Sequence, residues 1–252
     1  IRPLFHEAFE AMWSGRAEPD SLHQLVLAAE LSAREIAILR AYSRYLRQAG
    51  FTFSLAYVQQ TLVAHAALAR GLVRLFHARF DPQRAAPDGE EALVRELDAG
   101  LEQVPSLDDD RILRRFLATI RATTRTNAFQ PGADGAPKAY LSLKFDPRQV
   151  PGLPEPLPMF EIFVYSPRVE GVHLRGGKVA RGGLRWSDRM EDFRTEVLGL
   201  VKAQQVKNAV IVPVGSKGGF VLKRAPPASE REALMKEGIA CYQAYLRGLL
   251  DL

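Results

Sequence analysis

Three polar side chains in the last fifth of this sequence have the types and spacing to hold a small anion and move a proton. Gln204 and Lys207 lie three residues apart in a stretch with helical spacing, so both belong to one face of the helix. A Gln amide and a Lys amine on one face can grip a carboxylate from two directions. Lys217 follows in a Gly-Ser-Lys-Gly-Gly segment, which we interpret as a loop whose glycines let a ligand approach the backbone.

Lys217 is the candidate for acid–base chemistry. A lysine in a dry, glycine-walled pocket near other cations gives up its proton more readily than a lysine in water, so it can act as a general base or acid near neutral pH. The simpler alternatives are that Lys207 only decorates a helix C-terminus, where cations are favoured, and that Lys217 is a surface turn residue. A phosphate loop is excluded because the Gly-Lys-Ser/Thr order is missing.

Two arginines could bind a second anionic group. Arg181 and Arg185 flank Gly182-Gly183, which we expect to form a turn, and the planar fork of an Arg suits a carboxylate. Between residues 171 and 224 the chain carries 11 Lys and Arg against 4 Asp and Glu, together with 9 of its 19 glycines. Clustered cations attract anions, so this segment indicates a pocket for a small, multiply anionic molecule.

Other polar residues are assigned structural roles. No pair of histidines has the spacing of a metal site, and no metal is expected. The acidic residues that follow the arginines are expected to cap and pair. These histidines and acidic residues are His6, His23, His65, His77, His173, Asp188, Glu191 and Asp192.

The composition is that of an ordinary globular protein, with 47% apolar and 25% charged residues and a net charge of +5 over 252 residues. No apolar run approaches the roughly 18 residues that a membrane span needs. Cys241 is the single cysteine, so no internal disulfide can form and a reducing compartment, the cytoplasm, is expected. Because the chain starts at Ile1 rather than Met and its last residues continue a helical pattern, we expect a piece of a longer polypeptide.

The predicted secondary structure changes at about residue 130, from helices alone to strands and helices. Helical spacing predicts helices over 32–50, 54–79, 90–104, 106–127, 191–207 and 229–250, and apolar runs predict strands over 139–145, 159–165 and 209–212. Ser32 with Glu35 and Ser229 with Glu232 have the spacing of capping boxes. The expected organisation is a helical segment over 1–130, a turn-rich linker over 131–137 and an α/β segment over 138–252.

The run ARGGLRWSDR, followed by TEVLGLVKAQQVKNAVIVPVGSKGGF, closely resembles the catalytic region of the large bacterial NAD-specific glutamate dehydrogenases. It is more distantly similar to the substrate-binding segment of the small glutamate, leucine and phenylalanine dehydrogenases. The close resemblance covers about residues 138–252. It implies an incomplete α/β substrate-binding domain of the glutamate dehydrogenase type, preceded by a helical segment.

The resemblance also implies roles for individual residues. Arg181, beside Gly182 and Gly183, stands where the small enzymes have a lysine that binds the side-chain carboxylate of the substrate. Gln204 and Lys207 correspond to the residues that bind the α-carboxylate, and Lys217 corresponds to the catalytic lysine. The spacing between these two lysines is shorter here than in the small enzymes.

The implied reaction is the oxidative deamination of L-glutamate to 2-oxoglutarate and ammonia, a step of amino-acid catabolism. The resemblance also implies NAD as the cofactor, bound mainly by a domain downstream of this chain. Consistently, no G-x-G-x-x-G follows a strand here. In the family a catalytic aspartate also lies downstream. A cytoplasmic homo-oligomer without membrane or nucleic-acid partners is expected.

Two other hypotheses stay open at this point. The pI of 9.4 and the Arg-Gly-Gly segments are also typical of a non-enzymatic, basic nucleic-acid-binding module. Independently, residues 1–130 could serve regulation or assembly, since they contain none of the candidate site residues.

Overall fold

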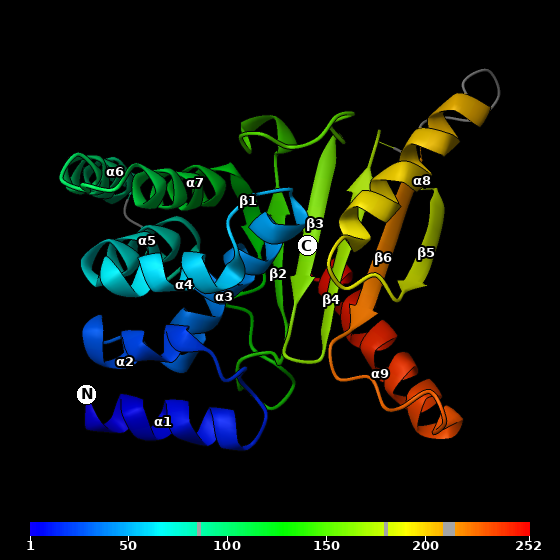
Figure 1. Ribbon diagram of the computed structural model, residues 1–252, viewed down its shortest axis with the longest axis horizontal. Helices are drawn as coiled ribbons and strands as arrows, with labels where there is room; N and C mark the ends of the chain where they lie inside the picture. Colours follow the sequence, from blue (N-terminus) through cyan, green and yellow to red (C-terminus); the bar gives the residue numbers. More distant parts are fainter. Residues whose placement is uncertain (85–86, 179–180, 209–214) are drawn as a thin grey trace. The chain divides into compact units, whose positions relative to one another are not determined.

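A computed structural model describes residues 1–84, 87–178, 181–208 and 215–252 (Figure 1). The side chains of residues 87–88 and 205–208 lie outside the described part. The predicted strand over 209–212 and the side chain of Lys207 therefore fall outside the described residues. The chain divides into two compact units, one formed by residues 1–47 and 51–121 and the other by residues 48–50 and 122–252.

The first unit is helical. Its helices are α1 (Arg2–Trp13), the 3₁₀ turn η1 (Ser21–Gln24), α2 (Leu25–Ala28), α3 (Ala33–Gln48), α4 (Leu55–Ala64), α5 (Ala66–Phe80), α6 (Pro87–Leu101) and α7 (Leu107–Ala122). The helix expected over 54–79 is two helices, separated at His65, whose backbone leaves the helical region (φ −108°, ψ 50°). The helix expected over 106–127 ends at Ala122, because the next residues form a strand.

The start of α3 confirms the predicted capping box. The Ser32 N–H and hydroxyl donate to Glu35 at 2.9 and 2.8 Å, and the Glu35 N–H donates back to the Ser32 hydroxyl at 3.3 Å. Glu35 also lies 3.3 Å from Nε2 of His77 on α5. The His77 ring, aided by the Ser32 donors, lowers the pKa of the Glu35 carboxyl to about 2, against the opposing effect of burial. One carboxylate thus both caps α3 and ties it to α5.

This lowered pKa predicts an acid-dependent part of the stability. Because the folded-state pKa of Glu35 lies below its ordinary value of 4.5, its contribution is complete above that value and is lost as the pH falls towards 2. The unfolding free energy of Glu35→Gln is expected to lie below that of the unchanged chain at neutral pH and to converge with it in acid. Urea titrations at several pH values test this, with the 85% exposed Glu91, changed to Gln, as the control. A difference for Glu35→Gln that does not vary with pH would contradict the assignment.

The second unit is built on a six-stranded sheet of order β1-β2-β3-β4-β6-β5. Its strands are β1 (Thr123–Thr126), β2 (Leu141–Phe145), β3 (Phe160–Tyr165), β4 (Val169–Arg175), β5 (Gly182–Ser187) and β6 (Ser216–Leu222). Neighbours pair antiparallel except β5 and β6, which are parallel and joined through α8 (Phe193–Asn208). The 3₁₀ turn η2 (Pro147–Gln149) and the helix α9 (Arg231–Leu250) complete the unit. This mixed sheet with helices confirms the expected α/β class.

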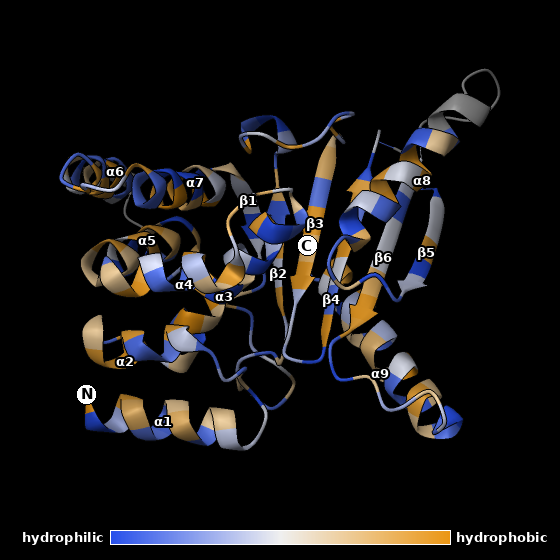
Figure 2. Cartoon of the chain, in the orientation of Figure 1, coloured by the Kyte–Doolittle hydropathy of each residue, from blue (hydrophilic) through white to orange (hydrophobic). Residues whose placement is uncertain are grey.

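Helices α8 and α9 cover opposite faces of this sheet (Figure 1). A Cβ atom at Gly219 would lie 2.6 Å from Val197 of α8, whereas one at Gly218 would lie 2.4 Å from the Tyr245 hydroxyl of α9. On the α9 side, Phe220 packs with Cys241, a buried free thiol, and with Tyr245 in an apolar core. Figure 2 shows the apolar segments of β3, β4 and β6 that supply the core. Successive residues of β6 therefore face α8 and α9 alternately.

Three sequence expectations are wrong. The Gly-Ser-Lys-Gly-Gly segment begins a strand, β6, rather than a loop, and Gly182-Gly183 opens the strand β5 rather than a turn. The expected Ser229–Glu232 capping box is absent, since α9 is capped by Glu230 without a side-chain hydrogen bond. Over the described part of the chain, no helix is long and apolar enough to cross a membrane.

Candidate functional site

The predicted site residues gather where β5 and β6 begin and α8 approaches its C-terminal end. The Ser216 N–H donates to the Arg181 carbonyl oxygen at 2.8 Å, which joins the first residues of the two parallel strands. The Gly176 N–H donates to the Gly215 carbonyl oxygen at 3.0 Å and brings in the end of β4. Three sequence segments thus converge at this edge of the sheet.

Lys217 is half-buried on the α8 face of β6. It lies in register with Leu174 of β4 and Gly183 of β5, and cross-strand partners share a face. Leu174 is fully buried on one side of the lysine. On the other side, a Cβ atom at Gly183 would have no heavy atom of the described residues within 4 Å. Among the residues that the structure describes, the lysine therefore has an apolar wall on one flank and open space on the other.

Gln204 lies on the same side of the sheet, near the end of α8. A Cβ atom at Gly215 would lie 2.2 Å from the Gln204 Nε2 and 2.1 Å from the Arg181 carbonyl oxygen, so only a glycine fits there. Among the described atoms, the Gln204 Oε1 is buried without a hydrogen-bond partner. Gly215 and Lys217 are two residues apart, which is roughly 7 Å along a strand. The Gln204 amide and the backbone of Lys217 therefore border one small region, into which Gly183 and Gly215 project no side chain.

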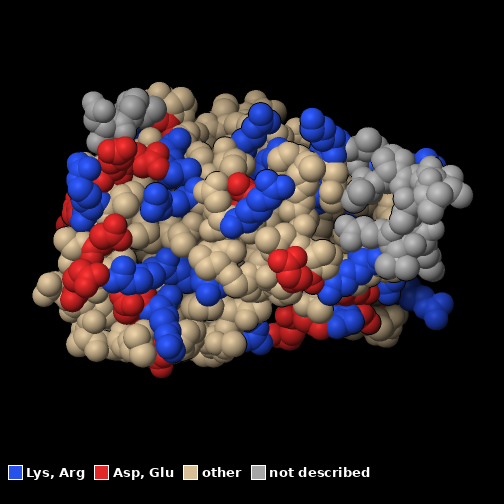
Figure 3. Space-filling model, turned by 90° about the horizontal axis from the view of Figure 1, so that it is seen from above, with Lys and Arg blue, Asp and Glu red and all other residues tan. Residues whose placement is uncertain are grey.

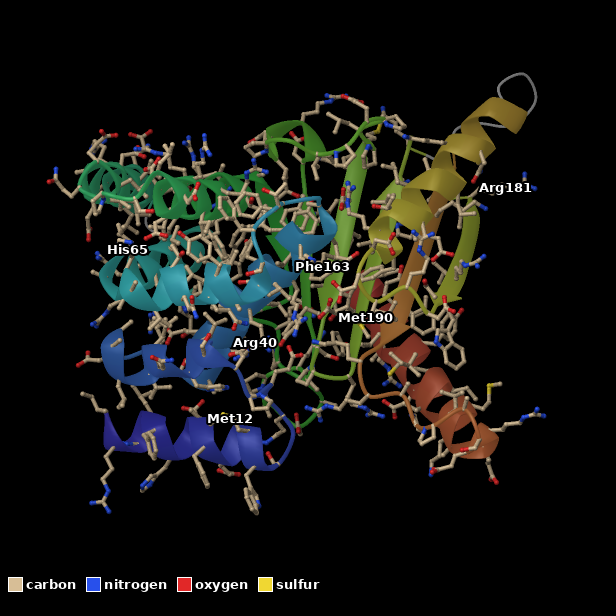
Figure 4. The ribbon with its side chains drawn as sticks, viewed as in Figure 1. Met12, Arg40, His65, Phe163, Arg181 and Met190 are labelled. Carbon is tan, nitrogen blue, oxygen red and sulfur yellow. The ribbon has the colours of Figure 1, made fainter. Side chains whose placement is uncertain are left out.

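One of the predicted residues, Arg181, stands apart from this region. Arg181 is exposed and its side chain extends outward from the start of β5 (Figure 4). Lys207 is one turn beyond Gln204 on α8, with its side chain outside the described residues. Gly182 and Gly183 differ sharply: a Cβ atom at Gly182 would overlap the Ser216 carbonyl oxygen at 1.4 Å, while Gly183 has free space. Gly182 is thus needed for strand contact, whereas Gly183 leaves room beside the lysine.

Arg185 is not a free anion-binding group. Its Nε lies 2.6 Å from the Glu196 Oε1 of α8, and the Ser187 hydroxyl donates to the other oxygen of this carboxylate. Sequence reasoning missed Glu196. The alternation of apolar and polar residues in Leu184-Arg185-Trp186-Ser187 indicated a strand, and the polar residues of this strand contact Glu196 of α8.

The acidic segment before α8 forms an ion pair, as expected. Arg189 pairs with Asp192, and this guanidinium lowers the pKa of the Asp192 carboxyl. Within the described ranges, no group of His, Cys, Asp and Glu side chains could hold a metal ion. His173 faces α9, on the side of the sheet opposite to Lys217, and burial together with the charge of Arg175 lowers its pKa.

A buried ion pair fixes α8 to the sheet. Arg194, near the start of α8, donates two hydrogen bonds of 2.7 Å to the carboxylate of Glu161 on β3, and both side chains are 0% exposed. Gln48 accepts a hydrogen bond from the Arg194 N–H at 3.2 Å and donates to the Met190 carbonyl oxygen at 2.9 Å. This arrangement anchors the helix that carries Gln204.

Comparisons with known proteins match nearly the whole chain. Residues 96–252 match the family model described as bacterial NAD-glutamate dehydrogenase, catalytic domain, and residues 17–82 match the model for glutamate dehydrogenase, helical motif 3. The whole chain is 58% identical to a protein of Halomonas elongata and 55% identical to one of Pseudomonas aeruginosa, and 98% of it is 52% identical to one of Mycobacterium tuberculosis. All three are named NAD-specific glutamate dehydrogenase, and the chain spans 16% of the length of each.

Proposed function

The chain belongs to the bacterial NAD-glutamate dehydrogenases, and from this premise we propose that it supplies the glutamate-binding half of an active site. The reaction is the conversion of L-glutamate, NAD and water into 2-oxoglutarate, ammonia and NADH. The observation that carries the proposal is that Gln204 and Lys217 border one region on the α8 face of the sheet, beside the open space at Gly183. The organisation into a helical segment over 1–130, a linker over 131–137 and the glutamate-binding part over 138–252 belongs to the same proposal.

Glutamate carries a carboxylate at each end, and the proposed site recognises both by charge. Gln204 and Lys207 bind the α-carboxylate, and the exposed guanidinium of Arg181 binds the side-chain carboxylate. The C-terminal end of α8 carries partial negative charge, which favours the substrate's ammonium group near the Gln204 Oε1, buried without a partner among the described atoms. Lys217 then holds the attacking water, takes its proton, and in the reverse direction polarises the carbonyl oxygen of the keto acid.

NAD, when bound, accepts the hydride from the α-carbon of glutamate. The natural place for its pyrophosphate in a parallel strand–helix unit is the connection before the helix. Between β5 and α8 this connection carries Asp188, Glu191 and Asp192 and no glycine. Asp192 is paired with Arg189, but Asp188 and Glu191 leave the connection with a net negative charge that would repel a pyrophosphate, so the residues present do not fit NAD. We propose that NAD binds mainly to a part of the enzyme outside this chain.

The full-length enzyme is further proposed to be a cytoplasmic homo-oligomer. The free Cys241 supports the reducing compartment, and the oligomeric state is a proposal of its own. The alternative of a nucleic-acid-binding module has no support. Arg185, which follows the second Arg-Gly-Gly segment, is paired with Glu196, and the face shown in Figure 3 mixes cationic with anionic groups rather than presenting a basic stripe.

The proposed recognition of the second carboxylate is tested in the full-length enzyme with Arg181→Ala. A lost charged hydrogen bond is worth about 1.5–3 kcal/mol, so kcat/KM for glutamate is expected to fall by roughly 10- to 150-fold. Activity with norvaline, which lacks the second carboxylate, should stay unchanged. Lys178→Ala, also exposed, is the matched control. An equal loss with both substrates would overturn the role of Arg181, and a full-length enzyme without glutamate-dependent NADH formation would overturn the function itself.

A further inference from the structure

Helix α1 presents its largest apolar side chains to solvent. Ile1, Phe5, Phe9 and Trp13 are spaced by four residues and are 59%, 49%, 53% and 85% exposed. Residues with this spacing lie along one side of a helix, and the rings of Phe9 and Trp13 are stacked with centroids 6.2 Å apart. We call these four residues the α1 stripe. In Figure 4 α1 is the helix that carries Met12.

The side of α1 that packs on the protein carries two small buried residues, with Leu4 and Met12 half-buried beside them. Ala8 and Ala11 are 2% and 5% exposed and are its buried residues. A surface helix ordinarily turns its large apolar side chains towards the core, since burying each one gains about 1.5–3 kcal/mol. In α1 three aromatic side chains and Ile1 stay outside the core, and a continuous exposed apolar stripe of this kind marks an interaction surface.

The size of the stripe argues against a second copy of the chain as its partner. With 12 residues, α1 is about 18 Å long, so one face covers a few hundred Å² at most. A stable interface between separate chains buries about 800 Å² on each side. A partner within the same polypeptide needs less area, because tethering supplies an effective concentration of about millimolar.

The comparisons favour a tethered partner. Residues 1–16 precede both matched family regions, which cover 17–82 and 96–252, yet the relatives from Halomonas elongata and Pseudomonas aeruginosa align with the whole chain and are far longer. We propose that the α1 stripe is the docking face for an apolar groove in another part of the same full-length polypeptide, outside residues 1–252. Helix α1 is then the element through which the helical unit is held to that part.

Hydroxyl-radical footprinting of the full-length polypeptide tests this proposal. Oxidation rates of Phe5, Phe9 and Trp13 are compared between the native and the urea-unfolded protein, with the 64% exposed Leu107 as an internal reference. The stripe is expected to be protected by about tenfold or more and to stay so on about tenfold dilution, because a tethered contact does not depend on concentration. Rates as fast as those of an exposed residue overturn the proposal. Protection that disappears on dilution overturns it too, in favour of a second copy.

A matched pair of variants gives a second readout. Phe9→Glu in the full-length protein places a charge in the docked face, so oxidation of Trp13 is expected to rise towards its unfolded rate. Leu107→Glu, on the exposed start of α7, should leave Trp13 protected. Equal protection of Trp13 in both variants counts against docking through this face.

Discussion

Lys217→Ala in the full-length enzyme is expected to lower kcat for glutamate oxidation by about 10²–10⁴-fold, the range of a lost general acid–base group. The KM for glutamate should change much less, because the proposed carboxylate ligands are other residues. The loss follows from chemistry rather than folding: Lys217 is only half-buried, and the neighbouring position on β5 is the open Gly183. Removing its side chain therefore breaks no packing on that flank.

Two comparisons separate this role from a structural one. A small primary amine such as ethylamine, added to the Lys217→Ala enzyme, should restore part of the activity, because it returns a titratable amine to the space left open. Lys217→Arg keeps the positive charge but cannot give up a proton, so it should stay slow. Lys202→Ala, on the exposed side of α8, is the control. Near-normal turnover of the alanine variant, or activity of the arginine variant close to that of the unchanged enzyme, would remove Lys217 from the chemistry.

The strand that carries Lys217 also explains where sequence reasoning failed. Glycines are poor strand formers, so Gly218 and Gly219 indicate a loop when considered alone. In the fold they are needed because both faces of β6 are covered: a side chain at Gly218 would strike Tyr245 and Leu184, and one at Gly219 would strike Val197. Contacts from distant segments decide this strand, and no local pattern contains them.

Elements whose signals are local were predicted well. The capping box at Ser32 and the apolar spacing of Ile36, Leu39 and Tyr42 predicted α3, and these three side chains are fully buried. By contrast, β1 was assigned to the preceding helix, because Thr123–Thr126 becomes a strand only by pairing with β2. The candidate residues Gln204 and Lys217 came from side-chain chemistry, but the close approach of Gly215 to the Gln204 amide depends on the chain returning from α8 into β6.

Arg194→Met is expected to destabilise the sheet-containing unit by about 3–5 kcal/mol, the usual cost of breaking a buried ion pair by removing one partner. Arg194 and Glu161 are both 0% exposed, and the mutation leaves the Glu161 carboxylate without its two 2.7 Å hydrogen bonds in a place that water cannot reach. The exposed pair Arg189–Asp192, with side chains 48% and 46% exposed, is the matched control. Arg189→Met should change the stability far less, because an exposed ion pair is screened by water.

The double variant Arg194→Met with Glu161→Leu distinguishes the cost of an unpaired buried charge from the loss of side-chain packing at Arg194. With no charge left buried, most of the lost stability is expected to return, since well-packed apolar replacements of buried ion pairs are often neutral. Urea unfolding of the unchanged protein, of Arg194→Met, of Glu161→Leu and of the double variant completes the thermodynamic cycle. A double variant as unstable as Arg194→Met would contradict the account, and would mean that packing of the Arg194 side chain, rather than its charge, holds the start of α8.

If the account is right, a restored fold need not restore turnover of the full-length enzyme. The charged pair fixes two directed hydrogen bonds between β3 and α8, whereas an apolar pair leaves the helix free to shift along the sheet. A lowered kcat/KM for glutamate in a double variant of normal stability would then measure how closely Gln204 must be placed.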